Sequence, residues 1–252
     1  MDQSEKRVLV VSAHAADYVW RAGGTIANYL RAGATVKILC LSYGQRGESE
    51  SAWANNPGIT EEEVCEIRRK ESETASKLLG CEIVFYGLQD HYMVIDRDTV
   101  MRLAKDIRDF QPDIVLTHSV YDPFNPDHDS VHKAVLAALR SANVTGTFPE
   151  TKKIKQPEIF CYEPDQPDIS GFMADVMIDI TDSWDLKLAA MKCFPTQAFM
   201  VQTYGLRTEF RGTLASRFGK GGSIKHATSS KEGVKYAEFF KRITPYVGQF
   251  FE

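Results

Sequence analysis

Two short stretches of the chain combine histidine with acidic residues in a pattern that suits a metal ion. Residues 12–17 (SAHAAD) place an imidazole three positions before a carboxylate, and residues 118–128 end on Asp-His after several Asp, Asn and Pro residues. Two imidazoles and one carboxylate from separate loops form a ligand set for Zn²⁺ that leaves one position open for water or substrate. The candidate metal ligands are therefore His14, Asp17 and His128.

The remaining histidines near these stretches have a structural and a functional interpretation. A single histidine after a strand is more often a hydrogen-bonded structural residue than a ligand. His118 either contacts the site or packs in the core. His132 lies four residues after His128 and could share its helix face, although we favour a supporting or surface position. His226 has no partner that the sequence identifies.

Apolar runs rich in β-branched residues alternate with helical patterns along the chain. A continuous apolar run is typical of a strand that is buried on both faces of a parallel sheet. The alternation predicts one α/β domain over residues 1–252, with a doubly wound, mostly parallel sheet and helices on both faces. The expected strands are 7–12, 35–42, 82–86, 113–117, 158–162 and 175–180; the expected helices are 19–31, 60–79, 98–110, 130–142 and 184–193; residues 44–58 are expected to form a long loop.

Polar residues gather directly after four of these strands. They occupy residues 12–17, 43–49, 89–92 and 118–128. In a doubly wound fold the loops at the carboxyl ends of the strands meet at one edge of the sheet, and ligands bind there. We therefore expect the four loops to form one site.

The composition excludes several classes of protein. A net charge of -4 argues against a general nucleic-acid binder, and no apolar run approaches the ~20 residues that span a bilayer. The first residues carry two acids before a short apolar run and no small-residue cleavage site, so we expect no signal peptide. The five cysteines, none spaced as C-x-x-C, indicate reduced packing residues in a cytoplasmic protein.

Residues 201–236 differ from the rest of the chain. They hold seven Lys or Arg against two acids and include the Gly-rich stretch GKGGSIKH. One interpretation is a solvated basic segment. The other is a lid or subunit contact that adds positive charge near an anionic substrate.

Three motifs resemble the PIG-L/LmbE-like family of zinc-dependent N-acetylglucosaminyl deacetylases and their relatives. They are A-H-x-x-D at the end of the first strand, x-P-D-H opening a helix, and I-R-x-x-E, which is formed by Ile67, Arg68 and Glu71. The resemblance runs from about Val8 to Val135, with weaker support at residues 236–238. It implies a Rossmann-like fold and a metal held by His14, Asp17 and His128.

The chain departs from the deacetylases at two positions that matter for hydrolysis. Ala16 stands where those enzymes typically have the Asp that activates the metal-bound water, and Asn125 stands where they have a His that acts on the tetrahedral intermediate. Loss of a general base costs ~10²- to 10⁴-fold in rate. We therefore expect a poor amide hydrolase. An amidohydrolase that uses Glu48 or Asp127 as base, and a catalytically idle metal-binding protein, remain as alternatives.

The metal ligands without the hydrolytic residues resemble one branch of the family, the 4-oxalomesaconate hydratases of gallate catabolism. Residues 10–24, 40–49 and 118–128 are similar to that branch almost position for position. The resemblance implies a zinc-dependent hydratase, a hydro-lyase that adds water to a small unsaturated oxo-polycarboxylic acid, 4-oxalomesaconate or a close relative. Mn²⁺ or Fe²⁺ would also suit the ligands.

This resemblance suggests roles for further residues. Glu48 is the candidate acid/base, and Arg46 and Arg68 are expected to bind substrate carboxylates, for which guanidinium groups are suited. Asp165 stands where the branch has His, and Val94 stands near where it has Arg, so Asp165 is a second catalytic candidate and the substrate could differ in detail. Four residues are expected to line the substrate pocket: Asp90, Tyr92, His118 and Asn125.

The expected partners follow from the same resemblance. The basic segment and the loop arginines suit a small anionic substrate. The habit of the family suggests a homo-oligomer, and neither nucleic acid nor a membrane is expected as a partner.

Overall fold

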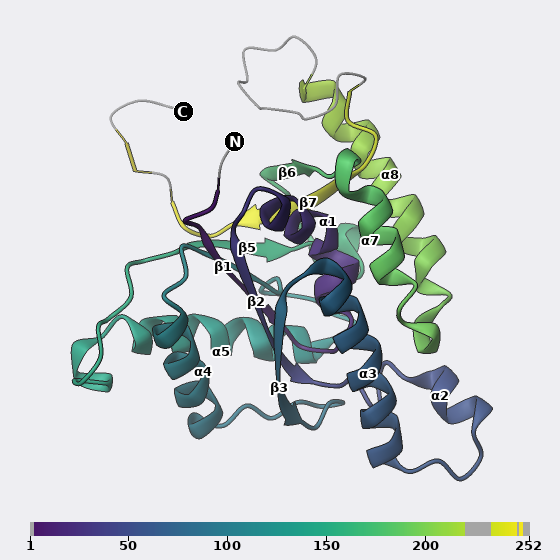
Figure 1. Ribbon diagram of the computed structural model, residues 1–252, viewed down its shortest axis with the longest axis horizontal. Coiled ribbons are helices and arrows are strands. Elements are labelled where there is room, and N and C mark those ends of the chain that lie inside the picture. Colours follow the sequence, from purple (N-terminus) through teal and green to yellow (C-terminus); the bar gives the residue numbers. More distant parts are fainter. Residues whose placement is uncertain (1–2, 220–232, 246, 249–252) are drawn as a thin grey trace.

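Figure 1 shows a computed structural model of the protein, which describes residues 3–219, 233–245 and 247–248. Its centre is a seven-stranded sheet in the order β3-β2-β1-β4-β5-β7-β6. Neighbouring strands from β3 to β5 are parallel, whereas β7 runs antiparallel to both β5 and β6. The strands are β1 (Arg7–Ser12), β2 (Thr35–Ser42), β3 (Glu82–Leu88), β4 (Ile114–Thr117), β5 (Glu158–Tyr162), β6 (Val176–Asp179) and β7 (Ala237–Arg242).

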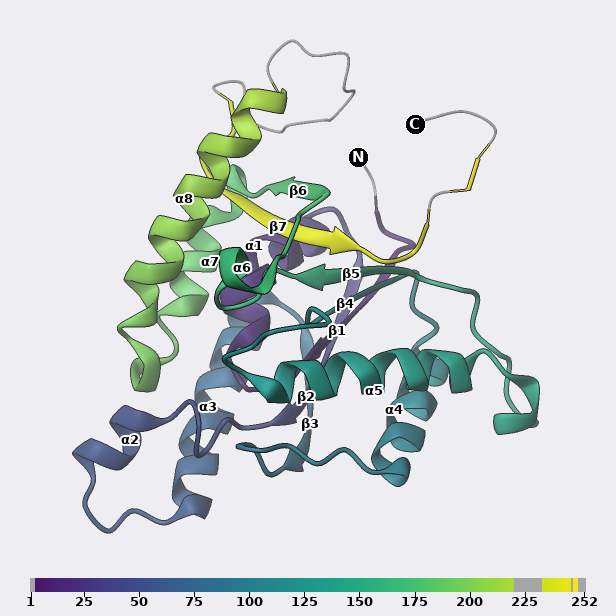
Figure 2. The same ribbon diagram turned by 180° about the vertical axis from the view of Figure 1, so that it is seen from behind.

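Helices cover both faces of this sheet (Figures 1 and 2). One face carries α1 (Asp17–Arg31), α3 (Glu61–Leu79), α7 (Trp184–Met191) and α8 (Met200–Gly219), and the other carries α4 (Arg97–Phe110) and α5 (Pro126–Ala142). Shorter elements are α2 (Glu50–Asn55), α6 (Pro167–Ser170), η1 (Thr145–Thr147), η2 (Thr181–Ser183) and η3 (Pro195–Gln197). The predicted α/β class with a mostly parallel, doubly wound sheet is confirmed.

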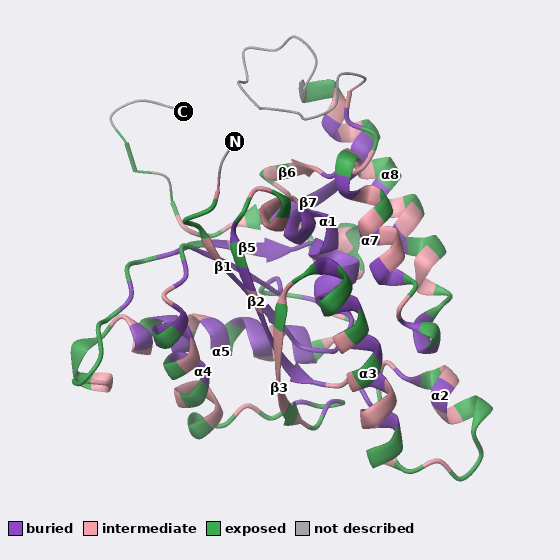
Figure 3. Cartoon of the chain, viewed as in Figure 1, coloured by how far each residue is buried: buried purple, intermediate pink, exposed green. Residues whose placement is uncertain are grey.

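The central strand β1 explains why the core has two halves. Val8 and Val10 pack into the cluster under α1 and α7, and Leu9 and Val11 pack into the cluster under α4 and α5. All four side chains are fully buried, and Figure 3 shows the same burial along the middle of the sheet. Successive residues of a strand point to opposite faces, so a run without polar residues fills both halves of the core.

Several element boundaries differ from the sequence-based expectation. The predicted loop over residues 44–58 contains α2, and α5 begins at Pro126 rather than at 130. The proline stands in the first turn of α5, where its missing N–H costs nothing because no intrahelical acceptor is available there. The Pro-rich stretch is therefore a helix start, and it places His128 inside the first turn of α5.

The basic segment 201–236 divides into two parts. Residues 201–219 belong to α8, which packs against α7, β6 and β7. These residues therefore form a packed helix, which neither interpretation of the segment had specified. Residues 220–232, with most of the Gly-rich stretch and His226, lie outside the described residues. Strand β7 follows and is an element that the sequence pattern did not predict.

Among the residues that the structure describes, no helix combines the length and the apolar character needed to cross a bilayer.

Candidate active site

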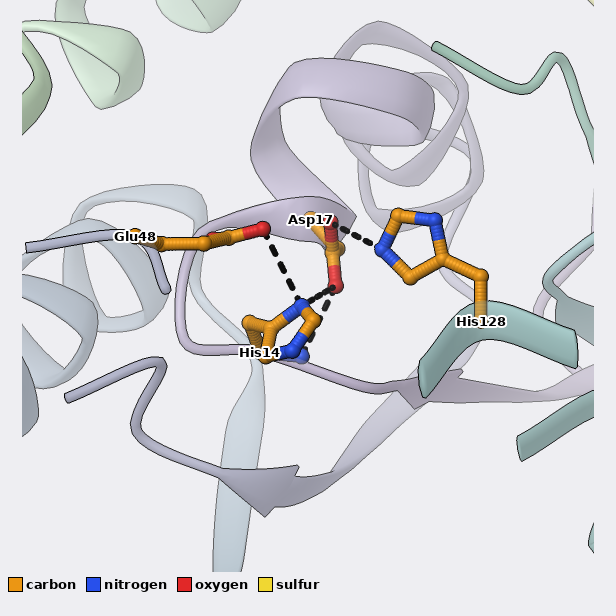
Figure 4. A group of neighbouring side chains, drawn as sticks. All are labelled: His14, Asp17, Glu48 and His128. Carbon is orange, nitrogen blue, oxygen red and sulfur yellow. Dashed lines mark hydrogen bonds and ion pairs between the residues drawn. The ribbon is translucent and has the colours of Figure 1, made fainter. Parts of the chain in front are cut away.

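Side chains from three loops meet at the carboxyl ends of β1, β2 and β4, as Figure 4 shows. His14 follows β1, and Asp17 opens α1. Glu48 lies between β2 and α2, and His128 lies in the first turn of α5. These four residues each offer one nitrogen or oxygen atom, and the four atoms lie within 4.8 Å of one another. The predicted convergence of the loops is confirmed for these residues.

The short distances between nitrogen and oxygen atoms of the group show that its side chains converge on one point. His14 Nδ1 lies 3.1 Å from Glu48 Oε1 and 3.3 Å from Asp17 Oδ2. His128 Nε2 lies 3.5 Å from Asp17 Oδ1. The side chains of His14, Asp17 and His128 are almost completely buried, whereas that of Glu48 is 15% exposed. Glu48 is thus the member of the group that is nearest to solvent.

A carboxylate holds each of the two imidazoles from the opposite side of the ring. His14 Nε2 lies 3.2 Å from Asp127 Oδ2, and His128 Nδ1 lies 2.9 Å from Asp122 Oδ2. The inward nitrogens, His14 Nδ1 and His128 Nε2, are buried and have no hydrogen-bond partner in the part of the chain that the structure describes. A metal-ligating histidine commonly donates its other N–H to a carboxylate, which fixes the ring and leaves the inward nitrogen as ligand. His14, Asp17 and His128 therefore fit a divalent metal ion.

The ionisation of the group follows from its closely spaced charges. Burial alone would lower the pKa of His14, but the carboxylates of Glu48, Asp127 and Asp17 outweigh it and hold that pKa well above its ordinary value. Burial would raise the pKa of Asp17, yet His128 and His118 bring it well below its usual range. The cluster of carboxylates therefore attracts positive charge to this point, and a metal cation would supply it.

Asp165 reaches the same edge of the sheet from the loop after β5. Its carboxylate Oδ1 accepts a hydrogen bond from Arg21 Nη2 at 2.6 Å, and its backbone N–H donates to Asp122 Oδ2 at 3.0 Å. Arg21 Nε in turn lies 3.3 Å from Asp17 Oδ1. Arg21 thus bridges the candidate ligand Asp17 and the candidate catalytic residue Asp165. The side chain of Asp165 is 30% exposed, which leaves it open to a bound molecule.

The two arginines expected to bind substrate occupy very different places. Arg46 is 54% exposed and forms an ion pair with Glu61 at the start of α3. Arg68 is completely buried. Its guanidinium donates to Glu71 Oε2 at 2.9 Å, to Thr196 Oγ1 at 2.8 Å and to Gln197 Oε1 at 2.8 Å, and one nitrogen lies 3.8 Å from Glu48 Oε2. In this arrangement Arg68 faces Glu48, whereas Arg46 is open to solvent.

Asp90 and Tyr92, which follow β3, differ sharply in exposure. Asp90 is 3% exposed, and its carboxylate accepts hydrogen bonds from the backbone N–H groups of Arg46 and Gly47. Tyr92 is 71% exposed, and Val94 beyond it is 81% exposed. Tyr92 is therefore accessible to a substrate, whereas the Asp90 oxygens are directed at the neighbouring loop.

His118 and Asn125 lie on either side of His128. The ring of His118 stacks on that of His128 with the centroids 4.0 Å apart, and its Nε2 accepts the Ala13 N–H at 2.9 Å. Burial, followed by the neighbouring His128, lowers the pKa of His118 to about 3, so it stays neutral. The half-buried Asn125 directly precedes α5, and its carbonyl accepts the His128 N–H.

Three residues support the candidate ligands in a way that the sequence did not predict. Asp122 and Asp127 orient the imidazoles, and Arg21 holds Asp17. Asp127, the alternative base of an amidohydrolase, instead accepts from His91 N at 3.0 Å and Met93 N at 2.7 Å. A metal-ligating histidine commonly has a carboxylate on its second nitrogen, so acidic partners could be expected, but the sequence does not show which acid reaches which ring.

Comparison with known proteins shows the family to which the chain belongs. The family model "PIG-L: GlcNAc-PI de-N-acetylase" matches residues 9–139, just over half of the chain. These residues include His14, Asp17, Glu48 and His128.

Two comparisons extend over nearly the whole chain. A 4-oxalmesaconate hydratase (an alternative spelling of 4-oxalomesaconate) from Pseudomonas putida KT2440 is 36% identical over 98% of this chain and 93% of its own length. The crystal structure of GalB, the 4-carboxy-2-hydroxymuconate hydratase of Pseudomonas putida KT2440, superimposes with a TM-score of 0.90 at 36% identity, covering 98% of this chain and 100% of that one.

A deacetylase is a more distant relative. A probable N-acetyl-alpha-D-glucosaminyl L-malate deacetylase 2 from Bacillus anthracis is 29% identical over 60% of this chain and 64% of its own length. The matched family model and the nearly full-length similarity lead to one conclusion: the chain belongs to the PIG-L family.

Proposed function

We propose that this protein is a metal-dependent hydratase that adds water to 4-oxalomesaconate or to its enol form, 4-carboxy-2-hydroxymuconate. The two names describe tautomers of one unsaturated tricarboxylic acid. The proposal is supported by the 36% identity to the Pseudomonas putida hydratase over nearly the full chain. The observation that carries it within the site is the position of Glu48, whose carboxylate faces His14 at 3.1 Å.

One position inside the first histidine motif argues against amide hydrolysis. Ala16 is completely buried and directly precedes α1, so the place where the deacetylases typically have an Asp base holds only a methyl group. Glu48 approaches the ligands from the loop after β2 instead. Because distant relatives of the chain are deacetylases, an N-acyl sugar or amine is the alternative substrate.

In hydration, the oxygen of water bonds to one carbon of the double bond and a proton is delivered to the other. Glu48 is the proposed group that takes the water proton, because it is both close to the ligands and partly exposed. A divalent ion held by His14, Asp17 and His128 would polarise the oxo-carboxylate end of the substrate. We propose Zn²⁺ for this ion, with Mn²⁺ or Fe²⁺ as alternatives.

The remaining carboxylates of the substrate need cationic or polar partners. Arg46 is exposed on the loop that carries Glu48, so we propose that it binds one of them after leaving Glu61. We propose that Arg68, which lies 3.8 Å from Glu48, binds another substrate carboxylate. We also propose that Asp165, which forms an ion pair with Arg21, donates or accepts a proton at the edge of the site. Tyr92, His118 and Asn125 stay candidate pocket residues.

The cellular setting and the assembly are also proposals. All five cysteines are free, which is consistent with the reducing cytoplasm that we propose for the enzyme. We also propose a homo-oligomer that binds a small anion and neither nucleic acid nor a membrane. Light scattering of the purified protein tests the oligomer, and a monomeric mass would overturn it.

The test of the function is a direct assay of the metal-loaded protein. Loss of the ultraviolet absorbance of 4-oxalomesaconate reports hydration, and an N-acetylglucosamine conjugate is tested in parallel. We expect hydration without amide release. Amide release in the absence of hydration would replace the proposal with the deacetylase alternative.

Glu48→Gln separates chemistry from metal binding. We expect the variant to keep its metal and to lose about 10²- to 10⁴-fold in kcat, because an amide cannot accept the water proton. Metal analysis of the same sample is the control. Retained hydration would remove Glu48 from its proposed role.

A further inference from the structure

The short segment 90–93, directly after β3, touches two separate parts of the site. Its first residue, Asp90, contacts the loop that carries Glu48. Asp90 Oδ2 accepts the Gly47 N–H at 2.7 Å, and both oxygens of the Asp90 carboxylate lie 3.1 Å from the backbone nitrogen of Arg46. Two successive backbone amides thus point at one buried carboxylate, which fixes the backbone on the N-terminal side of Glu48.

The packing between this segment and the loop is close. A Cβ atom added at Gly47 would lie 3.4 Å from Asp90 Oδ2 and 3.5 Å from His91 Nδ1. The space between the loop and the segment at Gly47 is therefore just wide enough for one methyl group, and the Gly47 N–H spans it to Asp90.

The same segment is tied to the metal ligands through Asp127. The backbone N–H groups of His91 and Met93 donate to the Asp127 carboxylate at 3.0 and 2.7 Å. Asp127 Oδ2 lies 3.2 Å from His14 Nε2. On the other side of its ring, His14 Nδ1 faces Glu48 Oε1 at 3.1 Å.

These contacts form a closed ring. It leads from His14 through Asp127 to segment 90–93, from Asp90 to the amides of Arg46 and Gly47, and from Glu48 back to His14. We propose that Asp90 is a positioning residue of this site: it sets the distance between Glu48 and the metal ligands and does not itself contact the substrate. This inference rests on the proposed acid/base role of Glu48.

A positioning role explains why a carboxylate is buried here. Asp90 is 3% exposed, and burial of a charged group is costly unless hydrogen bonds satisfy it. Its hydrogen-bond donors are the backbone amides of Arg46 and Gly47. An ionised carboxylate accepts from two amides at once and forms stronger hydrogen bonds to them than a neutral group does.

The first test measures the tether itself and requires no activity. Asp90→Asn replaces one acceptor oxygen with an NH₂ group that opposes the loop amides. We expect backbone hydrogen exchange over residues 44–48 to accelerate by roughly tenfold or more, while exchange in α5 stays unchanged. Unchanged exchange over residues 44–48 would overturn the proposal, whatever reaction the enzyme catalyses.

The second test asks whether Asp90 acts through Glu48. We expect Asp90→Asn to lower kcat for hydration by roughly 10- to 100-fold with KM changed less than about threefold and the metal retained, since a small misplacement of a catalytic group has this effect. In the Glu48→Gln background the same substitution should have little further effect. An equal further loss in that background, or an effect mainly on KM, would contradict the proposal.

Asp96→Asn is the matched control. Asp96 also accepts a backbone N–H, that of Thr99 at the start of α4, and it lies six residues after Asp90 without contacting the Glu48 loop. We expect it to leave kcat and the exchange of residues 44–48 unchanged. A wild-type enzyme without hydratase activity would refute the proposed function, and the exchange measurement would still decide on the tether.

Discussion

At the scale of single residues, the two imidazoles of the site are held in the same way. Each ring has one nitrogen on a buried aspartate and the other directed at the shared point between Asp17 and Glu48. The convergence of the candidate ligands His14, Asp17 and His128 was predictable from their residue types and from their places after the strands. The partners Asp122 and Asp127 were not chosen, because sequence distance does not reveal which acid reaches which ring nitrogen.

Replacement of the aspartate behind His128 tests this arrangement. Asp122→Asn removes the charge that orients His128 at 2.9 Å, so we expect metal affinity to fall by roughly 10- to 100-fold. Competition with a chromophoric chelator measures it. Asp109→Asn, an equal charge change at an exposed residue of α4, is the control and should leave the affinity unchanged. An affinity for Asp122→Asn equal to that of wild type would show that Asp122 does not support the metal.

At the scale of elements, the positions of the β1, β2 and β5 strands followed from their apolar runs, because each is a central strand with a clear boundary. The pattern failed at α5 and β7. Asp and Pro before His128 resemble a loop, yet they form a first helical turn. Strand β7 (AEFFKR) carries Glu238 and ends on two cations, so it shows neither a continuous apolar run nor a regular alternation, and its pairing with β5 and β6 depends on contacts that are distant in sequence.

The turn between β2 and α2 depends on Gly44. Its φ of +68° is a left-handed conformation, and a Cβ atom there would lie 3.1 Å from Glu48 Cβ and 3.2 Å from His14 Cβ. Gly44→Ala should therefore separate Glu48 from His14 and lower kcat by at least about tenfold, as well as cost about 1–2 kcal/mol from the backbone. Steady-state kinetics and urea unfolding measure the two effects.

Gly58→Ala separates those two effects. Gly58 has a φ of +90° but no atom within 4 Å of its added Cβ, so it bears the backbone cost without the steric contact. We expect a similar loss of stability and full activity. Equal kcat values for the two variants would show that the close approach at Gly44 does not position Glu48.

At the scale of the whole molecule, buried hydrogen bonds and an ion pair connect strand β7 to helices α1 and α7. Glu238 of β7 accepts hydrogen bonds from Gly24 N, Thr25 N and Thr25 Oγ1 at 2.6 to 2.9 Å, and it pairs with Lys187 of α7 at 2.6 Å. All of this lies inside the protein, since Lys187 and Glu238 are 1% and 4% exposed. The helix that presents Asp17 is thereby fixed by residues more than 150 positions later in the chain.

Lys187→Met tests this connection, because it leaves Glu238 as a buried carboxylate without its cation. Removal of one partner of a buried ion pair typically destabilises a protein by about 3–5 kcal/mol, so we expect a loss of that size in the free energy of unfolding. Urea unfolding measures it, with an unchanged m value indicating that the extent of unfolding is the same. Lys192→Met is the control, because Lys192 is an exposed lysine directly after α7. It should change the free energy of unfolding by less than about 0.5 kcal/mol. Equal unfolding midpoints for the two variants would mean that the backbone amides and the Thr25 hydroxyl of α1 hold Glu238 without Lys187.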